Sequence, residues 1–310
     1  MQAEERNSAA KDYYPSRKGE KGKLVERVDP VVYADELDAP PVSKELIADY
    51  QRSGFMILED VFCEKEVQAM QQELEKLRHS QAVKDSGEAI TEPGSGDIRS
   101  IFRVHQNSGL FRRLASDFRL ADIARYLLND EVYIHQSRLN YKPGFRGKEF
   151  YWHSDFETWH VEDGMPRMRA LSMSITLTEN HEYNGPLMLI PGSHKEYAVC
   201  EGYTPENHHT ASLKKQEYGV PSDNCLQQMA ATGGIVTATG KPGSVIIFDC
   251  NTMHGSNGNI SPYPRSNVFF VYNALSNSVV SPFCEQPPRP EYICSREDIE
   301  PLKVQGMLQD

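Results

Sequence analysis

The spacing of apolar residues changes near residue 130 and divides the chain into a helical part and a strand-rich part. In EKEVQAMQQELEKLRHS (64–80), the apolar residues recur at three- and four-residue spacing, which places them on one helix face: Val67, Met70, Leu74 and Leu77. We predict a helix there, a second over 110–128, and a short one before Gly54 with Ser43 as its N-cap. The apolar run FMILEDVF after Gly54 predicts a strand.

Beyond residue 130 the pattern alternates with a period of two. In RALSMSITLTE, Leu171, Met173, Ile175 and Leu177 alternate with Ser and Thr, as in a strand with one buried face. Further strands are predicted in these segments: VYIHQSRLNYK, EFYWHSDF, GPLMLIPGSH, GSVIIFDCNTMHGS and NVFFVYNALS. Many short strands after a helical portion favour a mainly β fold with flanking helices and a jelly-roll, cupin-like core.

Two segments do not fit this regular pattern. Residues 1–40 are polar and charged, so we expect a flexible or loosely docked arm ahead of one domain over 41–310. Residues 201–234 interrupt the strands with a long polar insertion, and segments of this length are often functional lids.

The charge and cysteine content narrow the class of protein. The chain has 310 residues and a formal net charge of −11, which disfavours nucleic acid and anionic membranes as partners. No apolar run is long enough to cross a bilayer, and the N-terminal segment lacks the apolar core of a secretory signal. Six scattered cysteines without a CxxC pair indicate neither a disulfide framework nor a zinc ribbon, so we expect a cytoplasmic protein.

The segment FYWHSDFETWHVEDGMP holds the strongest chemical signal. On a strand, His153 and Asp155 would point to the same side, and His254 follows a later strand. Two imidazoles and one carboxylate form the facial triad of non-haem Fe(II) oxygenases, which leaves positions open for a keto acid and dioxygen. A lone His-x-Asp occurs often by chance, so the triad depends on the distal histidine.

Arg265 begins the last predicted strand, where its planar guanidinium could grip a carboxylate; the alternative is a surface arginine that merely opens a strand. Polar residues of one parity lie along the strand that starts near residue 132: Gln136, Arg138, Asn140 and Lys142. The opposite parity is only partly apolar, so the sequence leaves open which face of this strand points inward.

With these motifs, the chain resembles the phytanoyl-CoA dioxygenase-like superfamily of Fe(II)/2-oxoglutarate oxygenases. The resemblance covers roughly residues 40 to 295 and includes the opening DYQRSGFMILEDVFCEKEV. The segment FYWHSDFETWHVEDGMP is similar to the signature of the ectoine hydroxylases within that superfamily. Halogenating members replace the metal carboxylate with a small residue, so Asp155 implies hydroxylation.

The resemblance implies a role for each matching position. It implies Fe(II) ligation by His153, Asp155 and His254, which are thereby the catalytic residues. It implies 2-oxoglutarate binding by Asn140, Lys142, Phe150, Ser256 and Arg265. It implies contacts with ectoine by Gln136, Arg138, Thr158, Trp159, Phe248 and Asn267.

The implied reaction is hydroxylation of ectoine to 5-hydroxyectoine with consumption of O2 and release of succinate and CO2, and the family implies a homodimer. Ectoine carries a delocalised amidinium, which an aromatic wall can bind by cation–π contact. Trp159 could equally be an ordinary core aromatic. The alternatives are a related hydroxylase of another small amino acid or an acyl-CoA, a barrel that binds a solute or metal without turnover, and, least favoured, a structural zinc protein.

Overall fold

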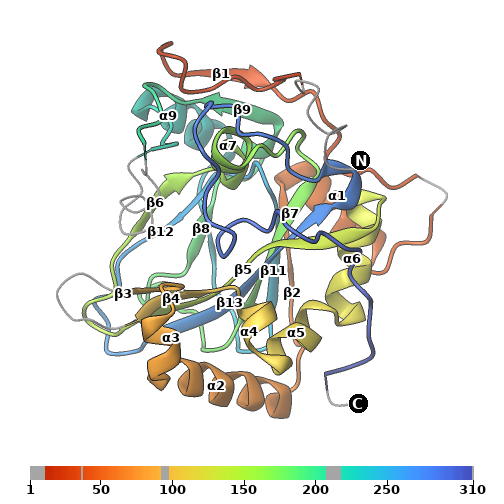
Figure 1. The fold of residues 1–310 in the computed structure, drawn as a ribbon, viewed down its shortest axis with the longest axis vertical. Helices are drawn as coiled ribbons and strands as arrows, with labels where there is room; N and C mark the ends of the chain where they lie inside the picture. The colour runs from red at the N-terminus through yellow and green to blue at the C-terminus, as the bar shows by residue number, and fades with distance from the viewer. Residues whose placement is uncertain (1–10, 36–37, 92–97, 207–217, 309–310) are drawn as a thin grey trace.

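Two antiparallel sheets form the body of the protein in the computed structural model (Figure 1). The structure describes residues 11–35, 38–91, 98–206 and 218–308. The larger sheet has the order β2-β11-β7-β13-β5-β4-β3, and the smaller has the order β10-β8-β12-β6. This is the jelly-roll arrangement with flanking helices that the sequence predicts.

The strands of the larger sheet are β2 (Phe55–Leu58), β3 (Ala89–Thr91), β4 (Ile98–Phe102), β5 (Val132–Lys142), β7 (Ala170–Thr176), β11 (Val245–Asp249) and β13 (Arg265–Ala274). Those of the smaller sheet are β6 (Phe150–His153), β8 (Leu187–Leu189), β10 (Val236–Ala238) and β12 (His254–Ser256). The segment 243–256 thus supplies one strand to each sheet.

The two faces of the larger sheet differ in chemistry, although both are buried. On β7, Leu171, Met173 and Ile175 lie in the main apolar core with residues of the helices. The intervening Ser172 and Ser174 are also buried, yet they face the smaller sheet, since Ser172 Oγ donates to Asp155 Oδ2 at 3.1 Å. The predicted alternation is confirmed, but the expectation of one buried face is wrong, because the polar side also faces the protein interior rather than solvent.

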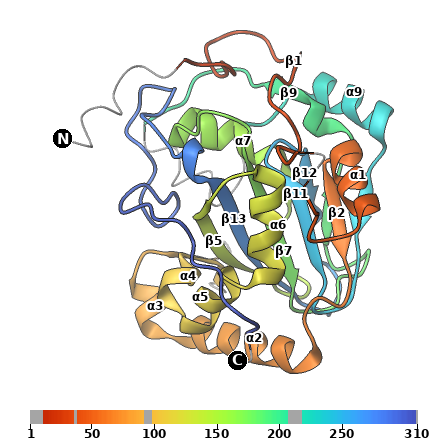
Figure 2. The ribbon, with the colours of Figure 1, turned by 90° about the vertical axis from the view of Figure 1, so that its right-hand side faces the viewer.

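The helices of the N-terminal half pack against the apolar face of this sheet, and Figure 2 shows α6 lying across β5, β13 and β7. They are α1 (Lys44–Ser53), α2 (Glu64–His79), α3 (Gln81–Asp85), α4 (Val104–Asn107), α5 (Gly109–Ala115) and α6 (Phe118–Leu128). Within the part of the chain that the structure describes, no helix is both long and apolar enough to cross a membrane.

Local sequence signals account for the helix ends. Ser43 Oγ accepts from Leu46 N, and Gly54 ends α1 in the left-handed region at φ 85°, so both predicted caps are confirmed. The single helix predicted over 110–128 is wrong. The Asp117 side chain accepts from Arg119 N and starts a new helix, which separates α5 from α6.

The expectation of a loosely held N-terminal arm is wrong for residues 11–35, which we call the N-terminal strap. Its β1 (Lys23–Glu26) pairs with β9 (Glu196–Val199), and Tyr14 is 1% exposed. The strap holds two arginines, Arg17 and Arg27, and buried carboxylates of the main body pair with both. Composition alone does not reveal such partners.

The predicted insertion is only partly irregular. Its second half forms α9 (Asp223–Gly233), which Ser222 caps through Cys225 N and which packs through Leu226 and Met229. The remainder of the insertion includes residues 207–217, which lie outside the described residues. The structure therefore gives no test of the lid expectation there.

Candidate active site

His153 and Asp155 meet at the junction of β6 and α7 (Asp155–Thr158). The sequence argument assumed one continuous strand, which is wrong. The strand ends at His153, Ser154 stays extended at φ −102° and ψ 131°, and Asp155 begins the helix. The two side chains nevertheless converge, because the extended backbone at Ser154 keeps them on one side, which faces the larger sheet where Ser172 holds Asp155.

His254 completes the cluster from the first position of β12, which pairs directly with His153. The Nε2 atoms of His153 and His254 lie 3.8 Å and 3.9 Å from Asp155 Oδ1. The ligand atoms of all three residues lie within 4.8 Å of one another, close enough to share one ion.

Backbone carbonyls fix both histidine rings. Tyr151 O lies 2.7 Å from His153 Nδ1, and Thr252 O lies 2.9 Å from His254 Nδ1. A carbonyl only accepts, so each Nδ1 carries the hydrogen and each Nε2 presents its lone pair toward Asp155. This tautomer is the one required of a histidine that binds a metal through Nε2.

Electrostatics favour the ligand protonation states. Burial, and to a lesser extent His254, lowers the pKa of His153 to about 4, so its ring is neutral at pH 7. Burial alone would raise the pKa of Asp155, but His254, His153 and Arg138 outweigh it and lower that pKa. A neutral His153 imidazole and an ionised Asp155 carboxylate fit a divalent transition metal.

Strand register decides which face of β5 points inward. Gln136, Arg138, Asn140 and Lys142 pair with Val271, Phe269, Asn267 and Arg265 of β13, respectively. Cross-strand partners share a face. Ser172, which donates to Asp155 and so lies on the face of the sheet toward the site, pairs with Val271. All four polar residues of β5 therefore lie on the side of Asp155, together with Asn267 and Arg265.

Arg265 is a buried cation whose Nε has no hydrogen-bond partner among the described residues. It is 4% exposed, and burial lowers the pKa of its guanidinium to about 10. A buried charge is costly unless an opposite charge or hydrogen bonds compensate it. The unused donor therefore fits a carboxylate ligand such as that of a keto acid.

The other residues predicted for the cosubstrate lie around Arg265. Lys142 Nζ donates to Ser256 Oγ at 2.8 Å, which links the two sheets. Asn140 Oδ1 accepts from Ser100 Oγ at 2.8 Å. The Phe150 ring lies 5.6 Å from Lys142 Nζ. The five residues predicted to bind the cosubstrate thus lie together at one end of the site, between the two sheets.

The residues predicted for the substrate divide into two groups. Among the described residues, neither the amide atoms of the buried Asn267 nor Arg138 Nε have a hydrogen-bond partner. The Phe248 ring lies 4.9 Å from that of His254. Gln136 Nε2 instead donates to the carbonyl oxygen of Ile293 at 2.8 Å.

The second group, Thr158 and Trp159, lies on the segment that follows Asp155. Thr158 Oγ1 is buried and unpaired, whereas Trp159 belongs to an apolar cluster with Phe156 and Met165. Trp159 opens η2 (Trp159–Asp163), a single turn of π-helix, and such turns recur at functional sites.

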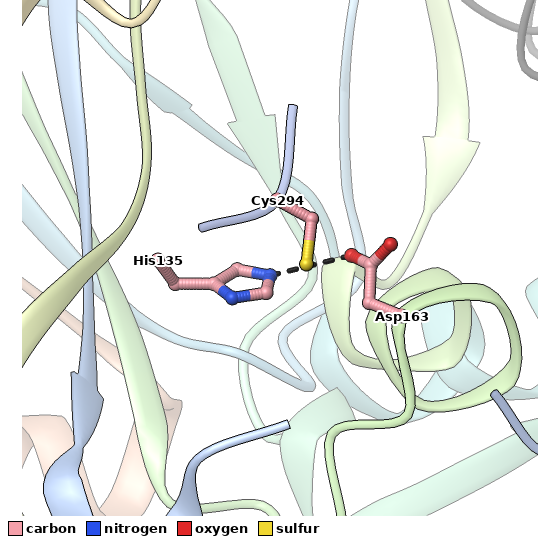
Figure 3. A group of neighbouring side chains, drawn as sticks. All are labelled: His135, Asp163 and Cys294. Carbon is pink, nitrogen blue, oxygen red and sulfur yellow. Dashed lines mark ion pairs between the residues drawn. The ribbon is translucent and has the colours of Figure 1, made fainter. Parts of the chain in front are cut away.

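A second cluster, of His135, Asp163 and Cys294, was not predicted from the sequence (Figure 3). His135 Nε2 lies 3.3 Å from Asp163 Oδ2, and its ring contacts Trp159 at 5.3 Å. The three residues come from distant segments, so no local spacing marks them. His135 also lies where β5 gains one unpaired residue, since Gln136 and Ile134 pair with successive residues of β13.

Arg289 forms an ion pair with Asp163, the carboxylate of this second cluster. Its Nε and Nη2 donate to Asp163 Oδ1 and Oδ2 at 2.7 Å and 2.5 Å. Burial raises the pKa of the Cys294 thiol well above its usual range, and Asp163 adds to the shift. A metal there would lie beside a guanidinium and need a thiolate, so these residues fit a structural contact better than a metal site.

Known proteins resemble this chain over nearly its whole length. The phytanoyl-CoA dioxygenase (PhyH) family model matches residues 50–267. An ectoine dioxygenase of Stutzerimonas stutzeri (strain A1501) is 55% identical over 293 residues, which are 94% of this chain and 97% of that protein.

Solved structures agree with this relationship. The crystal structure of EctD from S. alaskensis with 2-oxoglutarate and 5-hydroxyectoine is 51% identical, has a TM-score of 0.88, and covers 96% of this chain and 99% of its own. The structure of EctD from S. alaskensis with bound Fe has a TM-score of 0.86 at 50% identity, with the same coverage of both chains. The chain thus belongs to the phytanoyl-CoA dioxygenase family, among its ectoine dioxygenases.

Proposed function

We propose that this protein is an Fe(II)- and 2-oxoglutarate-dependent dioxygenase that converts ectoine to 5-hydroxyectoine and releases succinate and CO2. The observation that carries the proposal is the convergence of His153, Asp155 and His254, with both Nε2 atoms directed at one carboxylate. The relatives named above support the choice of ectoine as substrate.

The three converging residues would hold ferrous iron on one face and leave the opposite face for ligands. When bound, the iron activates dioxygen and couples the oxidative decarboxylation of 2-oxoglutarate to insertion of an oxygen atom into the substrate. Ser172 keeps Asp155 oriented by donating to Oδ2, which leaves Oδ1 toward the histidines.

Arg265 would bind the distal carboxylate of 2-oxoglutarate through its unused donor. Beside this position Lys142 Nζ already donates to Ser256 Oγ, and Ser100 Oγ donates to Asn140 Oδ1. These hydrogen bonds hold this end of the site in place before the cosubstrate binds. The Phe150 ring closes the same end against the guanidinium of Arg99, which lies 3.8 Å from its centroid.

Ectoine would lie between the metal and the polar face of the larger sheet. Asn267 offers an unpaired donor and acceptor, Arg138 a cation for the carboxylate, and Phe248 an aromatic face for the amidinium. Gln136, Thr158 and Trp159 would complete the wall. Since water is excluded from these buried groups, the polar contacts that fix the substrate are strengthened.

The test is anaerobic addition of Fe(II), 2-oxoglutarate and ectoine, followed by oxygen and analysis of both products. We expect succinate and 5-hydroxyectoine in equal amounts, and little succinate with proline or an acyl-CoA instead. Succinate formed equally with those compounds would favour another hydroxylase. Iron binding without substrate-dependent succinate would favour a barrel that binds its ligand without turnover.

A cytoplasmic location and a homodimer, with a role in the response to osmotic stress, complete the proposal. The six cysteines, all within the described residues, form no disulfide with one another, which suits a reducing compartment. Light scattering of the purified protein tests the dimer, since a monomeric mass at working concentration would contradict it.

A further inference from the structure

The N-terminal strap lies over the end of the sandwich that carries α7 and η2 (Figure 1). Besides the pairing of β1 with β9, Arg17 N donates to Cys200 O and Cys200 N donates to Ser16 Oγ. The strap is therefore held by hydrogen bonds at Ser16 and Arg17 and, further along, by the pairing of β1.

Arg17 bridges two carboxylates of the α7–η2 segment. Its Nη2 lies 2.5 Å from Glu157 Oε2, its Nε donates to Glu157 Oε1 at 3.0 Å, and its Nη1 lies 2.5 Å from Glu162 Oε1. Ser16 Oγ also donates to Glu157 Oε1, at 2.6 Å. Arg17 is 3% exposed, and its backbone is in the left-handed region at φ 54°, which a non-glycine residue adopts at a cost.

Glu157 lies within the residues assigned to the site. It follows Asp155 by two positions and directly precedes Thr158 and Trp159, while Glu162 lies at the far end of the same π-helical turn. The Arg17 guanidinium therefore joins both ends of the segment that presents the substrate wall. Without it, two buried carboxylates would lose their shared counter-charge.

A residue in the middle of the long insertion reaches the same point. Gly219 has φ +69°, and a Cβ at this residue would collide with Glu157 and Arg17 and come within 3.1 Å of Thr158 Oγ1. The strap, the insertion and the substrate wall thus meet around one guanidinium, with no room for a side chain on Gly219.

We propose that Arg17 is a positioning residue for the substrate wall: through Glu157 and Glu162 it sets where Thr158 and Trp159 stand, and so sets ectoine affinity and the coupling of decarboxylation to hydroxylation. This inference rests on the proposed function. It gives the strap a part in recognising the substrate as well as in holding the fold together.

A purely structural role would predict loss of stability alone, and Arg119 offers a matched control for that effect. Arg119 likewise bridges two carboxylates, with Nη2 2.7 Å from Glu66 Oε1 and 2.6 Å from Asp117 Oδ2, but it does so in the helical layer. Lys18 is a control at which no effect is expected, since its exposed Nζ donates only to the carbonyl oxygen of Phe283 in the described contacts.

The experiment compares the full-length wild type with Arg17→Gln, Arg17→Lys, Arg119→Gln and Lys18→Gln. Turnover of ectoine by the wild type is measured first. Its absence would refute the proposed function, and the variants would then give no information about ectoine binding. For each variant we would measure melting temperature, KM for ectoine, KM for 2-oxoglutarate, and succinate formed per 5-hydroxyectoine.

We expect Arg17→Gln to raise KM for ectoine roughly tenfold and to form excess succinate, since small displacements of positioning groups have large kinetic effects. KM for 2-oxoglutarate should stay near the wild-type value, and Arg17→Lys should recover part of the loss. Arg119→Gln should lower only the melting temperature, and Lys18→Gln should match the wild type.

Wild-type KM and coupling in folded Arg17→Gln would overturn the proposal, as would the same uncoupling in Arg119→Gln. If Arg17→Gln does not fold, Glu157→Gln and Arg17→Lys decide the matter. Raised KM for ectoine with excess succinate in these folded variants supports the proposal, and wild-type values in both contradict it.

Discussion

The His153–Asp155–His254 cluster and the His135–Asp163–Cys294 cluster both gather metal-binding residue types in the interior. In the first, carbonyls hold the Nδ1 atoms, so both Nε2 lone pairs face the carboxylate. In the second, Arg289 takes both carboxylate oxygens and the thiol stays protonated. Donor types alone therefore do not define a metal site; hydrogen bonds and neighbouring charges decide whether the donors are available.

Two buried arginines show the same difference between a group that is paired within the protein and one that is available to a ligand. Arg289 spends its donors on Asp163, whereas Arg265 keeps Nε without a partner among the described residues. We therefore propose that the first arginine stabilises its surroundings and that the second binds an anion. The predictions below test these differences.

The largest effect is expected from Asp155→Ala, because loss of the carboxylate leaves two neutral imidazoles and no charge to hold the metal. We expect the iron content to fall close to zero and product formation to drop by roughly 1,000-fold or more. Metal analysis and product assay check both. Hydroxylation that persists in this variant would contradict the assignment of the first cluster.

Arg265→Gln should weaken 2-oxoglutarate binding roughly 100-fold, since truncating one partner of a buried charge pair costs about 2–5 kcal/mol in binding. The folded protein should lose little stability, because no ion pair within the described residues is broken. KM for 2-oxoglutarate and a melting curve separate the two effects. A large loss of stability at unchanged KM would mean that the arginine is structural.

Arg289→Gln should show the opposite stability response. Removal of its guanidinium leaves the buried Asp163 carboxylate without its arginine partner, although the His135 ring remains 3.3 Å away. Breaking a buried ion pair in this way typically costs about 3–5 kcal/mol. Denaturant unfolding of this variant and of Arg265→Gln makes the comparison directly. Equal free energies of unfolding for the two variants would contradict the conclusion that Arg289 is paired within the protein while Arg265 is available to a ligand.

His135→Gln should leave the iron stoichiometry at one ion per chain, whereas His153→Gln should abolish it. Some rise in KM for ectoine is expected from His135→Gln, because the ring packs against Trp159. Titration of apoprotein with Fe(II) gives the stoichiometry. Two ions per wild-type chain, with one lost in His135→Gln, would establish the second cluster as a metal site.

The smallest effect belongs to Cys294→Ser. The thiol is buried and neutral, so we expect activity within about threefold of the wild type and a stability loss of roughly 1 kcal/mol, typical of core substitutions. Activity and melting measurements check this. A tenfold loss of activity would assign the thiol a role that the geometry does not suggest.

The sequence alone determined the elements whose signals are local. The caps at Ser43 and Gly54, the helix over 64–79 and the alternation of β7 follow from short-range sterics, hydrogen bonding and hydrophobic periodicity. The convergence of the three residues proposed to bind iron was also predicted, since their types restrict the chemistry even though the strand assumed at Asp155 was wrong.

Tertiary structure decided the features that depend on partners far along the chain. Register with β13 fixed the inward face of β5, which carries polar groups on both sides, so period alone is ambiguous. The strap is ordered because its arginines meet carboxylates more than a hundred residues away, and Asp163 is denied to a metal by Arg289. Charge pairing across such distances leaves no periodic trace, because the chain itself brings the partners together only when it folds.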